Sequence, residues 1–429
     1  MPEKIIRDPV HDVIAFRTER PVDGLLFRLI NAAEFQRLRR VRQLGFANLA
    51  YPGADHSRYG HSLGVMETAR KMLGQLRQSF EIDQQDETVC LAACLLHDLG
   101  HGPFSHVFER ISGFDHESLT RRIVEDPDSE VHQILLAHDL TLPFQVARFI
   151  SGESPRRFLG DILSSQLDAD RLDYLLRDNL MTGSRYGDYD LGWLLHALTI
   201  DDTSGRLAVT WKGVSAVEAY LQSRYHMYRN VYFHKVVRGA EGMVKLALQR
   251  ARRLAVQERL PWPPRDNVVY KSLLGQRLTT AEFTDLDDIS MLHCFKLWAL
   301  ADDAPLAALC KGLLYRKVYK TIDLTHVDSP DRRSRMVAAA EAAVEAAGGD
   351  AAYDLFLDSP DHARADDALS GPGRATDDIL VRDARGKTAN FATVSPQTHA
   401  LNQQLRFQRL HVAPQWIDQV TSALAQDVV

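Results

Sequence analysis

The chain has 429 residues, 45% hydrophobic and 25% charged, which is the balance of a globular protein and excludes wholesale disorder. Its formal net charge of −6 gives no overall positive field that would attract nucleic acid. A local basic patch is still compatible with this net charge. No apolar run approaches the roughly 20 residues that a membrane-spanning helix needs, and the charged start has no apolar signal core. We therefore expect a cytoplasmic protein without a membrane segment.

The first part of the chain is predicted to be almost entirely helical. Apolar side chains recur at helical spacing over 24–43 and 56–79, and residues 87–97 are apolar almost all round, as in a central, fully packed helix. Two short β-prone runs around a Ser-Gly turn predict a β-hairpin over 198–211. A long amphipathic helix, with room for an interruption, is predicted over 214–255.

The later part of the chain differs in character. A Pro-Trp-Pro-Pro segment at 261–264 stops helix formation and is the predicted domain boundary. Beyond it helices alternate with short β-prone runs, and residues 358–377, rich in Asp, Ser, Pro and Gly, are predicted to form a mobile loop. The predicted fold class is mostly α, with an all-helical core domain over 1–260 and a smaller C-terminal α+β lobe over 265–429.

A predicted buried helix ends in two polar residues. His97 and Asp98 follow a run of apolar residues and come just before Gly100, a natural helix terminator. Neighbouring side chains on a regular helix diverge by about 100°, but a distorted last turn can direct both to one ion. Burying the aspartate is costly without such a partner.

Two further segments offer candidate ligands for the same ion. His61 lies on a separate predicted helix, where a lone histidine is more often a core residue than a ligand. Asp170, Tyr174 and Asp178 are spaced i, i+4 and i+8, so they share one face of another helix. The alternative interpretation of this segment, a solvated acidic face, explains its two remaining early aspartates, Asp168 and Asp173.

Two imidazoles and two carboxylates suit one divalent ion, and this donor set does not distinguish Mn, Fe, Zn, Ni and Mg. Four protein ligands would leave positions open for water and substrate, which catalysis requires. His101, His106 and His116 would then be acid or base groups near this site, because imidazoles titrate near neutral pH. The guanidinium of Arg58, three residues before the first candidate ligand, is suited to phosphate oxygens.

These residues together resemble a known family. The series His61, His97-Asp98 and Asp170 is similar to the H…HD…D signature of the HD-domain phosphohydrolases. More narrowly, segments 58–64, 97–106 and 168–174 resemble the deoxynucleoside triphosphate triphosphohydrolases linked to a sterile alpha motif and their bacterial relatives, a likeness that covers about residues 4–250. The Gly-Tyr-Pro companion of cyclic-dinucleotide enzymes and the Glu-Asp of alarmone hydrolases are missing.

The resemblance implies a role for each matching residue within 43–235. The metal would be held by His61, His97, Asp98 and Asp170. His101 and His116 would act around the scissile phosphate, with Glu109 orienting the acid. The implied phosphate-binding residues are Arg58, Arg224 and Arg171, the last at a position where the family often has Lys. The implied sugar-binding residues are Gln43, Tyr174 and Asp178.

The implied function is a metal-dependent dNTP triphosphohydrolase that releases deoxynucleoside and inorganic triphosphate, with one divalent ion, additional Mg on the nucleotide, and a homo-oligomeric assembly. One alternative changes the substrate, giving a nucleotide monophosphatase or an enzyme for a modified nucleotide. Another is a single-stranded nucleic-acid-binding protein or nuclease that uses the arginine runs at 37–42 and 250–253, which the net charge does not favour. A non-catalytic scaffold is disfavoured because every metal-ligand type is intact.

Overall fold

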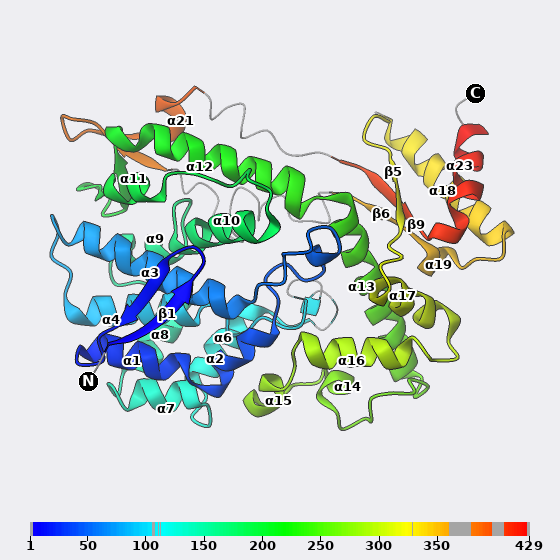
Figure 1. Cartoon of the computed structure of the whole chain (residues 1–429), viewed down its shortest axis with the longest axis horizontal. Coiled ribbons are helices and arrows are strands. Elements are labelled where there is room, and N and C mark those ends of the chain that lie inside the picture. Colours follow the sequence, from blue (N-terminus) through cyan, green and yellow to red (C-terminus); the bar gives the residue numbers. More distant parts are fainter. Residues whose placement is uncertain are drawn as a thin grey trace.

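A computed structural model describes residues 3–104, 108–109, 111, 113–327, 329–359, 379–396 and 407–426. Most of these residues are helical, and the helices form one large body beside a smaller lobe that contains a three-stranded sheet (Figure 1). This confirms the expected fold class, mostly α with a smaller α+β lobe. In the described part of the chain, no helix is long and apolar enough to cross a membrane.

The helical body is built around α4 (Gln84–Leu96), in which every residue from 87 to 96 is buried. The helix begins where the Asp83 side chain accepts a hydrogen bond from the backbone of Asp86, a favourable N-cap. Helices α3 (Arg58–Leu76), α8 (Leu142–Ile150) and α9 (Arg157–Leu163) pack against it, and α10 (Ala169–Thr182) packs against α3. The other early elements are β1 (Lys4–Asp8), β2 (Asp12–Phe16), α1 (Pro21–Ile30), α2 (Ala33–Arg37), α6 (His116–Glu125) and α7 (Glu130–Leu136).

The segment predicted as one helix over 24–43 is two helices. The backbone of Ala32 is extended (φ −64°, ψ 144°), which separates α1 from α2. Contacts from α7 stabilise the break, because Glu130 accepts a hydrogen bond from the backbone of Ala33 and donates its own backbone N–H to Glu34. Helical spacing alone could not reveal this tertiary contact.

The predicted β-hairpin over 198–211 is confirmed, with β3 (Leu198–Ile200) antiparallel to β4 (Leu207–Thr210). It follows α11 (Leu191–His196). The predicted long helix is interrupted, because α12 (Val214–Met227) leads into a π-helical turn before α13 (Lys235–Val256) begins.

The chain beyond α13 contributes to both parts of the molecule. Helices α14 (Val268–Leu273), α15 (Thr280–Thr284), α16 (Asp288–Trp298) and α17 (Ala304–Leu314) pack into the same apolar core as α13. The smaller lobe has its own core between the antiparallel sheet β5-β9-β6 and two helices. Its elements are β5 (Lys320–Asp323), α18 (Pro330–Ala346), α19 (Ala351–Asp354), β6 (Leu355–Asp358), β9 (Arg409–Val412) and α23 (Ile417–Gln426).

One late segment returns to the helical body. β7 (Leu380–Arg382) pairs in parallel with β4, and β8 (Thr388–Asn390) extends that sheet before α21 (Phe391–Val394) (Figure 1). The predicted boundary at 261–264 thus lies just after α13, but the residues beyond it do not form a single separate lobe. Most of the predicted loop over 358–377 lies outside the described residues.

Candidate metal centre and active site

The four candidate metal ligands come from three elements of the helical body. His61 lies on the first turns of α3, His97 caps the C-terminus of α4, Asp98 follows it, and Asp170 lies in the first turn of α10. α10 begins here because the Asp168 side chain accepts a hydrogen bond from the backbone of Arg171. Helices α3, α4 and α10 pack together, so three segments far apart in sequence meet at one point.

The candidate ligand atoms converge. His61 Nε2 lies 2.9 Å from Asp170 Oδ1, and His97 Nε2 lies 3.8 Å from the same oxygen. Asp98 closes the cluster, with Oδ1 3.3 Å from His97 Nε2 and Oδ2 3.8 Å from His61 Nε2. The grouping of His61, His97 and Asp170 is compact enough to hold a metal ion, with the Asp98 carboxylate beside it.

Hydrogen bonds on the far side of each imidazole orient it. His97 Nδ1 lies 2.9 Å from the carbonyl oxygen of Cys94, so this nitrogen carries the hydrogen and Nε2 is left with a lone pair. His97 Nε2 is buried and makes no hydrogen bond with any described residue. A buried acceptor without a donor is costly, and a divalent cation would satisfy it. The donor set therefore fits a divalent metal.

The carboxylates determine the charge of the cluster. Burial lowers the pKa of His61, but Asp170 and Asp173 outweigh it and raise the pKa to about 10. Burial raises the pKa of Asp98, but Arg58 and the neighbouring imidazoles outweigh it and hold the carboxyl ionised. Binding of a cation at His61 Nε2 would displace a proton, so occupancy of the site should depend on pH.

A second histidine pair lies beside the candidate ligands. Glu109 Oε1 lies 2.9 Å from His116 Nδ1 and 3.4 Å from His101 Nδ1, and the two rings stack with centroids 4.0 Å apart. His101 Nε2 also lies 3.2 Å from Asp98 Oδ1, which links this histidine pair to the candidate metal ligands. The predicted acid-base group is thus assembled in one place; His106 lies outside the described residues.

The two histidines of this pair differ in pKa. Burial lowers the pKa of His101 to about 3, and the positive charges of Arg58 and His116 act in the same direction. Burial also lowers the pKa of His116, but the bond to Glu109 outweighs it and raises the pKa above its ordinary value. Because a protonated imidazole beside a neutral one is an acid ready to donate, His116 is the better candidate for the general acid.

Gly100 is needed for this approach of two helices. A Cβ atom on Gly100 would lie 2.0 Å from the carbonyl oxygen of His116. The Thr120 hydroxyl joins the same two segments, donating to the His97 carbonyl and accepting from the Gly100 backbone. Any larger residue at position 100 would push the start of α6, and with it His116, away from the site.

The three predicted phosphate-binding arginines have different partners. Arg58 is buried and its Nη1 donates to Asp98 Oδ2 over 2.5 Å. Arg171 pairs with Asp168 and donates to the Ser165 carbonyl, yet its Nε is buried without a hydrogen bond to any described residue. Arg224 donates from Nη1 to Gln166, whereas its buried Nε and Nη2 make no hydrogen bond with any described residue.

The predicted sugar-binding residues lie near one another and near the candidate metal ligands. The Tyr174 ring is 6.4 Å from the His61 ring, edge to face, and 6.3 Å from the Tyr232 ring. Asp178 is buried and already has two partners, His56 Nε2 at 2.7 Å and the Tyr232 hydroxyl at 2.8 Å. Gln43 bonds the His56 carbonyl through its backbone, and its side-chain oxygen is buried without a partner among the described residues.

The sequence interpretation of the two remaining aspartates of α10 as a solvated face is wrong. Both are completely buried, because Asp168 caps α10 and pairs with Arg171, and Asp173 accepts a hydrogen bond from His61 Nδ1 at 2.9 Å. A signal for Asp173 existed in the sequence, since Arg177 follows it at i+4 on the same face of the helix. Sequence reasoning also missed His11, which contacts Asp173.

Comparison with known proteins agrees with this geometry. The family model of the HD domain matches residues 58–177, the stretch that carries all four candidate ligands, and the model of an HD-associated region matches 189–259. The uncharacterized protein YwfO of Bacillus subtilis is 37% identical over 362 residues, or 83% of this chain and 79% of YwfO. The chain belongs to the HD-domain family. Residues 58–177 thus form an HD domain, a fold that supports a phosphohydrolase.

More distant relatives have a stated activity. The deoxynucleoside triphosphate triphosphohydrolase SAMHD1 homolog of Dictyostelium discoideum is 28% identical over 306 residues, covering 66% of this HD-domain chain but only 56% of the relative. A phosphohydrolase of Bacteroides thetaiotaomicron has the same fold, with a TM-score of 0.80, 28% identity, and coverage of 96% of this chain and all of the other. A hypothetical protein of Aquifex aeolicus, 24% identical, has a similar fold with a TM-score of 0.74.

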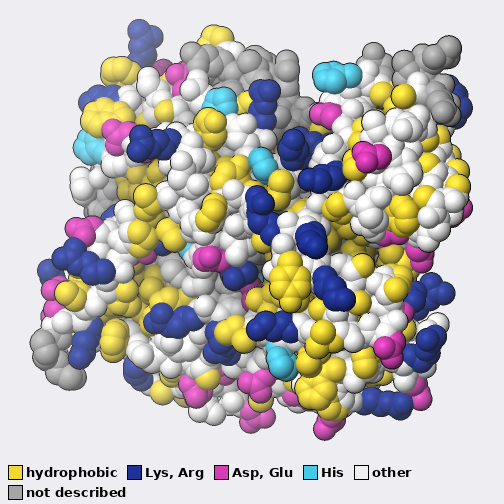
Figure 2. Space-filling view, turned by 45° about the vertical axis from the view of Figure 1, so that its right-hand side comes forward, with side chains coloured by type: hydrophobic (Ala, Val, Ile, Leu, Met, Phe, Trp, Pro, Cys, Tyr) yellow, Lys and Arg dark blue, Asp and Glu magenta, His cyan; other side chains and the backbone are white. Residues whose placement is uncertain are grey.

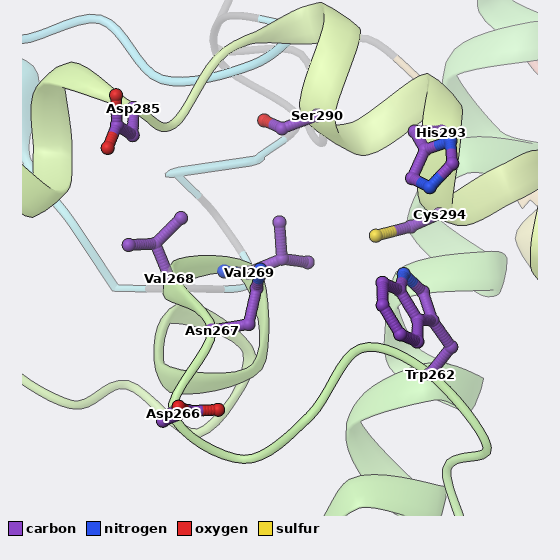
Figure 3. Close-up of a pocket in the computed structure, with 9 residues that line it drawn as sticks. All are labelled: Trp262, Asp266, Asn267, Val268, Val269, Asp285, Ser290, His293 and Cys294. Atoms are coloured by element: carbon purple, nitrogen blue, oxygen red, sulfur yellow. Dashed lines mark hydrogen bonds between the residues drawn. The ribbon is translucent and has the colours of Figure 1, made fainter.

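A pocket of about 350 Å³ lies elsewhere, where α14, α16 and the segment after α13 meet (Figure 3). The Trp262 and His293 rings stand at one end of it, and Asp266 and Asp285 lie toward the other. None of the predicted site residues lines this pocket, so it is separate from the HD site.

Proposed function

We propose that this HD-domain protein is a metal-dependent dNTP triphosphohydrolase that cleaves dNTPs to deoxynucleoside and inorganic triphosphate. The observation that carries the proposal is a pair of arginines, the buried Arg224 and the half-buried Arg171, which have buried N–H groups with no acceptor among the described residues. A buried guanidinium is costly unless its donors are satisfied, and phosphate oxygens satisfy several at once. Two such arginines near Tyr174 suit a ligand with more than one phosphate.

Other observations favour the same ligand class. Distant relatives are named as deoxynucleoside triphosphate triphosphohydrolases at 28% identity. Lys and Arg side chains gather on one face of the molecule, beside the boundary between the helical body and the C-terminal lobe (Figure 2). Positive charge of this kind attracts polyanions in spite of a net charge of −6.

In this proposal each group of residues has one task. His61, His97, Asp98 and Asp170 would hold a divalent ion, which would polarise a phosphoryl oxygen and supply a nucleophilic water. Arg58, Arg171 and Arg224 would bind and orient the phosphates, and Tyr174 would face the sugar. His116, held at Nδ1 by Glu109, would donate a proton from Nε2 to the 5′-oxygen that leaves.

The main alternative keeps the metal centre and changes the substrate to a nucleoside monophosphate or a modified nucleotide. A single phosphate group would accept hydrogen bonds from fewer N–H groups than Arg58, Arg171 and Arg224 together offer. The two possibilities differ in product, because a monophosphatase releases orthophosphate and a triphosphohydrolase releases inorganic triphosphate.

The nucleic-acid alternative is disfavoured because most of the arginines that it would use are bonded to other groups of this chain. Arg37 is buried and donates to the carbonyls of Leu99, His101 and Leu286. The other arginines of the two runs with partners are Arg39 over the Tyr59 ring, Arg40 with Asp287, Arg42 with Asp55, Arg250 with Asp303, and Arg252 with the Ile111 carbonyl. Side chains committed in this way are not a free surface for a nucleic-acid backbone.

The proposal is tested by product analysis on metal-loaded protein. Purified protein is assayed for bound metal and then incubated with each of the four dNTPs, and the products are separated by ion-exchange chromatography. We expect a deoxynucleoside and inorganic triphosphate in equal amounts from at least one dNTP, and none from a His61→Ala variant. Orthophosphate as the only phosphate product would contradict the proposal and favour the monophosphatase.

A further inference from the structure

A fifth polar side chain, the carboxylate of Asp173, lies behind the candidate metal ligands. Asp173 is completely buried one turn after Asp170 on α10, and its Oδ2 lies 2.9 Å from His61 Nδ1. The imidazole of His61 therefore lies between two carboxylates, Asp170 on the Nε2 side and Asp173 on the Nδ1 side.

Asp173 is itself held by two other side chains. Arg177, one turn later on α10, donates from Nε to Oδ2 at 2.8 Å and from Nη2 to Oδ1 at 2.9 Å. His11 Nε2 lies 2.8 Å from Asp173 Oδ1. With the bond from His61, the carboxylate has four donors, so its position and its negative charge are both fixed.

The N-terminal hairpin supports this arrangement. Asp8, the last residue of β1, accepts from Arg177 Nη1 at 2.8 Å and from Nη2 at 3.2 Å. The same carboxylate accepts from the backbone N–H groups of Val10 and His11, which fixes the turn that carries His11. A chain of buried bonds thus runs from the hairpin through Arg177 and Asp173 to a candidate metal ligand.

Helix α3 packs closely against Asp173. Gly64, one turn after His61 on α3, faces it, and a Cβ atom at this position would lie 1.8 Å from Asp173 Oδ1 and 2.3 Å from Arg177 Nη2. The glycine allows α3 and α10 to approach closely enough for the His61–Asp173 bond. Without that approach the imidazole would have no partner on its Nδ1 side.

We propose that Asp173 is a positioning residue of the metal centre, which fixes the tautomer of His61 so that Nδ1 carries the hydrogen and Nε2 binds the ion, and that the hairpin residues Asp8 and His11 stabilise it through Arg177. An imidazole free to rotate or to carry its hydrogen on Nε2 is a poorer ligand. A carboxylate on the opposite nitrogen also makes the ligand nitrogen more basic. The inference rests on the metal centre of the proposed function.

The test is metal affinity, measured on the full chain without substrate. Mn²⁺ is titrated into EDTA-treated, dialysed protein, and free Mn²⁺ is measured by electron paramagnetic resonance. Asp173→Asn keeps the size of the side chain but loses the charge and one acceptor, and should raise the Kd for Mn²⁺ by about 10- to 100-fold. Asp8→Asn leaves the His61–Asp173 bond in place and should raise the Kd by a smaller factor.

The matched control is Asp161→Asn. Asp161 is also a buried, ion-paired aspartate, which accepts from Arg206 and from the backbone of Leu207, but it does not contact the metal cluster. Its substitution should lower the thermal stability of the metal-free protein as Asp173→Asn does, and leave the Kd for Mn²⁺ unchanged. A purely structural role for Asp173 would lower thermal stability without changing the Kd.

The outcomes separate this inference from the proposed function. An unchanged Kd in Asp173→Asn would overturn the positioning role alone. If Asp173→Asn does not fold, an unchanged Kd in Asp8→Asn would overturn it. Wild-type protein that binds no Mn²⁺ would overturn the metal centre as well, whereas wild-type protein that binds Mn²⁺ but does not hydrolyse dNTPs would overturn only the proposed substrate.

Discussion

At the scale of single residues, the His101–Glu109–His116 group carries the most specific claim about chemistry. His116→Ala should retain bound metal, since the ring contacts Glu109 and His101, which are not among the four candidate ligands. Turnover should fall by about 10²- to 10⁴-fold, the usual effect of losing a general acid. The control is His138→Ala, outside the site. Loss of metal in His116→Ala would instead make His116 a ligand.

Tyr174 carries the claim about the sugar. A ring packed against the ribose leaves no room for a 2′-hydroxyl and gives it no partner, at a cost of about 1–3 kcal/mol. Wild-type protein should therefore prefer dGTP over GTP in competition kinetics. Tyr174→Ala should narrow this preference, and Tyr174→Phe, which keeps the ring, should preserve it. Equal use of both nucleotides by the wild-type protein would refute the role of Tyr174.

Residue types and spacing predicted a metal site at the adjacent His97 and Asp98 and at Asp170, which shares a helix face with Tyr174. The position of His61 alone favoured a core residue, and its assignment as a ligand rests on the resemblance to the HD-domain phosphohydrolases. The sequence did not predict that the Asp173 carboxylate lies behind His61. An aspartate on a helix is usually solvated, and only the packing of α3 on α10 shows that Asp173 faces His61. The difference lies in tertiary contacts, which spacing along one helix does not encode.

At the scale of elements, two glycines of α3 give a matched comparison. Gly64→Ala would drive a methyl group into Asp173 and Arg177 and should lower the free energy of unfolding by about 1–3 kcal/mol. Gly74→Ala, with nothing within 4 Å of its added methyl, should raise it by about 0.5–1 kcal/mol. Urea unfolding of metal-free protein measures both. A neutral or stabilising Gly64→Ala would contradict the close packing of α3 and α10.

The sheet of the C-terminal lobe contains a histidine that should make stability depend on pH. Burial lowers the pKa of His411 to about 4, whereas in the unfolded chain it is about 6.5. The unfolded chain therefore binds the proton more readily, and this contribution to stability is complete above about pH 6.5 and is lost as the pH falls toward 4. Asp358 opposes the shift, and Arg409 and Arg238 add to it.

The size of this effect follows from the pKa difference. Between pH 7 and pH 5 His411 should reduce the free energy of unfolding by about 2 kcal/mol. His411→Leu removes the titrating group, so its stability should fall less over the same interval, as measured by urea unfolding at both pH values. An identical loss in the variant and the wild type would show that His411 does not cause the dependence.

Helix periodicity predicted α3, α4 and the hairpin β3–β4 well, since their apolar patterns match their burial. It did not predict the break at Ala32 or the return of β7 to β4. The break depends on Glu130 of α7, and the strand pairing joins residues about 170 positions apart, so neither leaves a local pattern in the sequence.

At the scale of the whole molecule, residues at the start of α16 stabilise the segment from Leu99 to Phe104, which carries His101 of the histidine pair. Arg37 is buried and donates to the carbonyls of Leu99, His101 and Leu286, and Asp288 accepts from the backbone of Phe104. The region beyond the HD-associated match therefore contributes to the geometry of the candidate active site, even though it supplies none of the candidate ligands.

The central claim is that water attacks the α-phosphorus of a dNTP at the HD site. The most direct measurement is mass spectrometry of the products formed from dGTP in water enriched in oxygen-18. Attack at the α-phosphorus predicts one labelled oxygen in the inorganic triphosphate and none in the deoxyguanosine. Label in released orthophosphate, or in the deoxynucleoside, would place the attack at another atom and contradict the account.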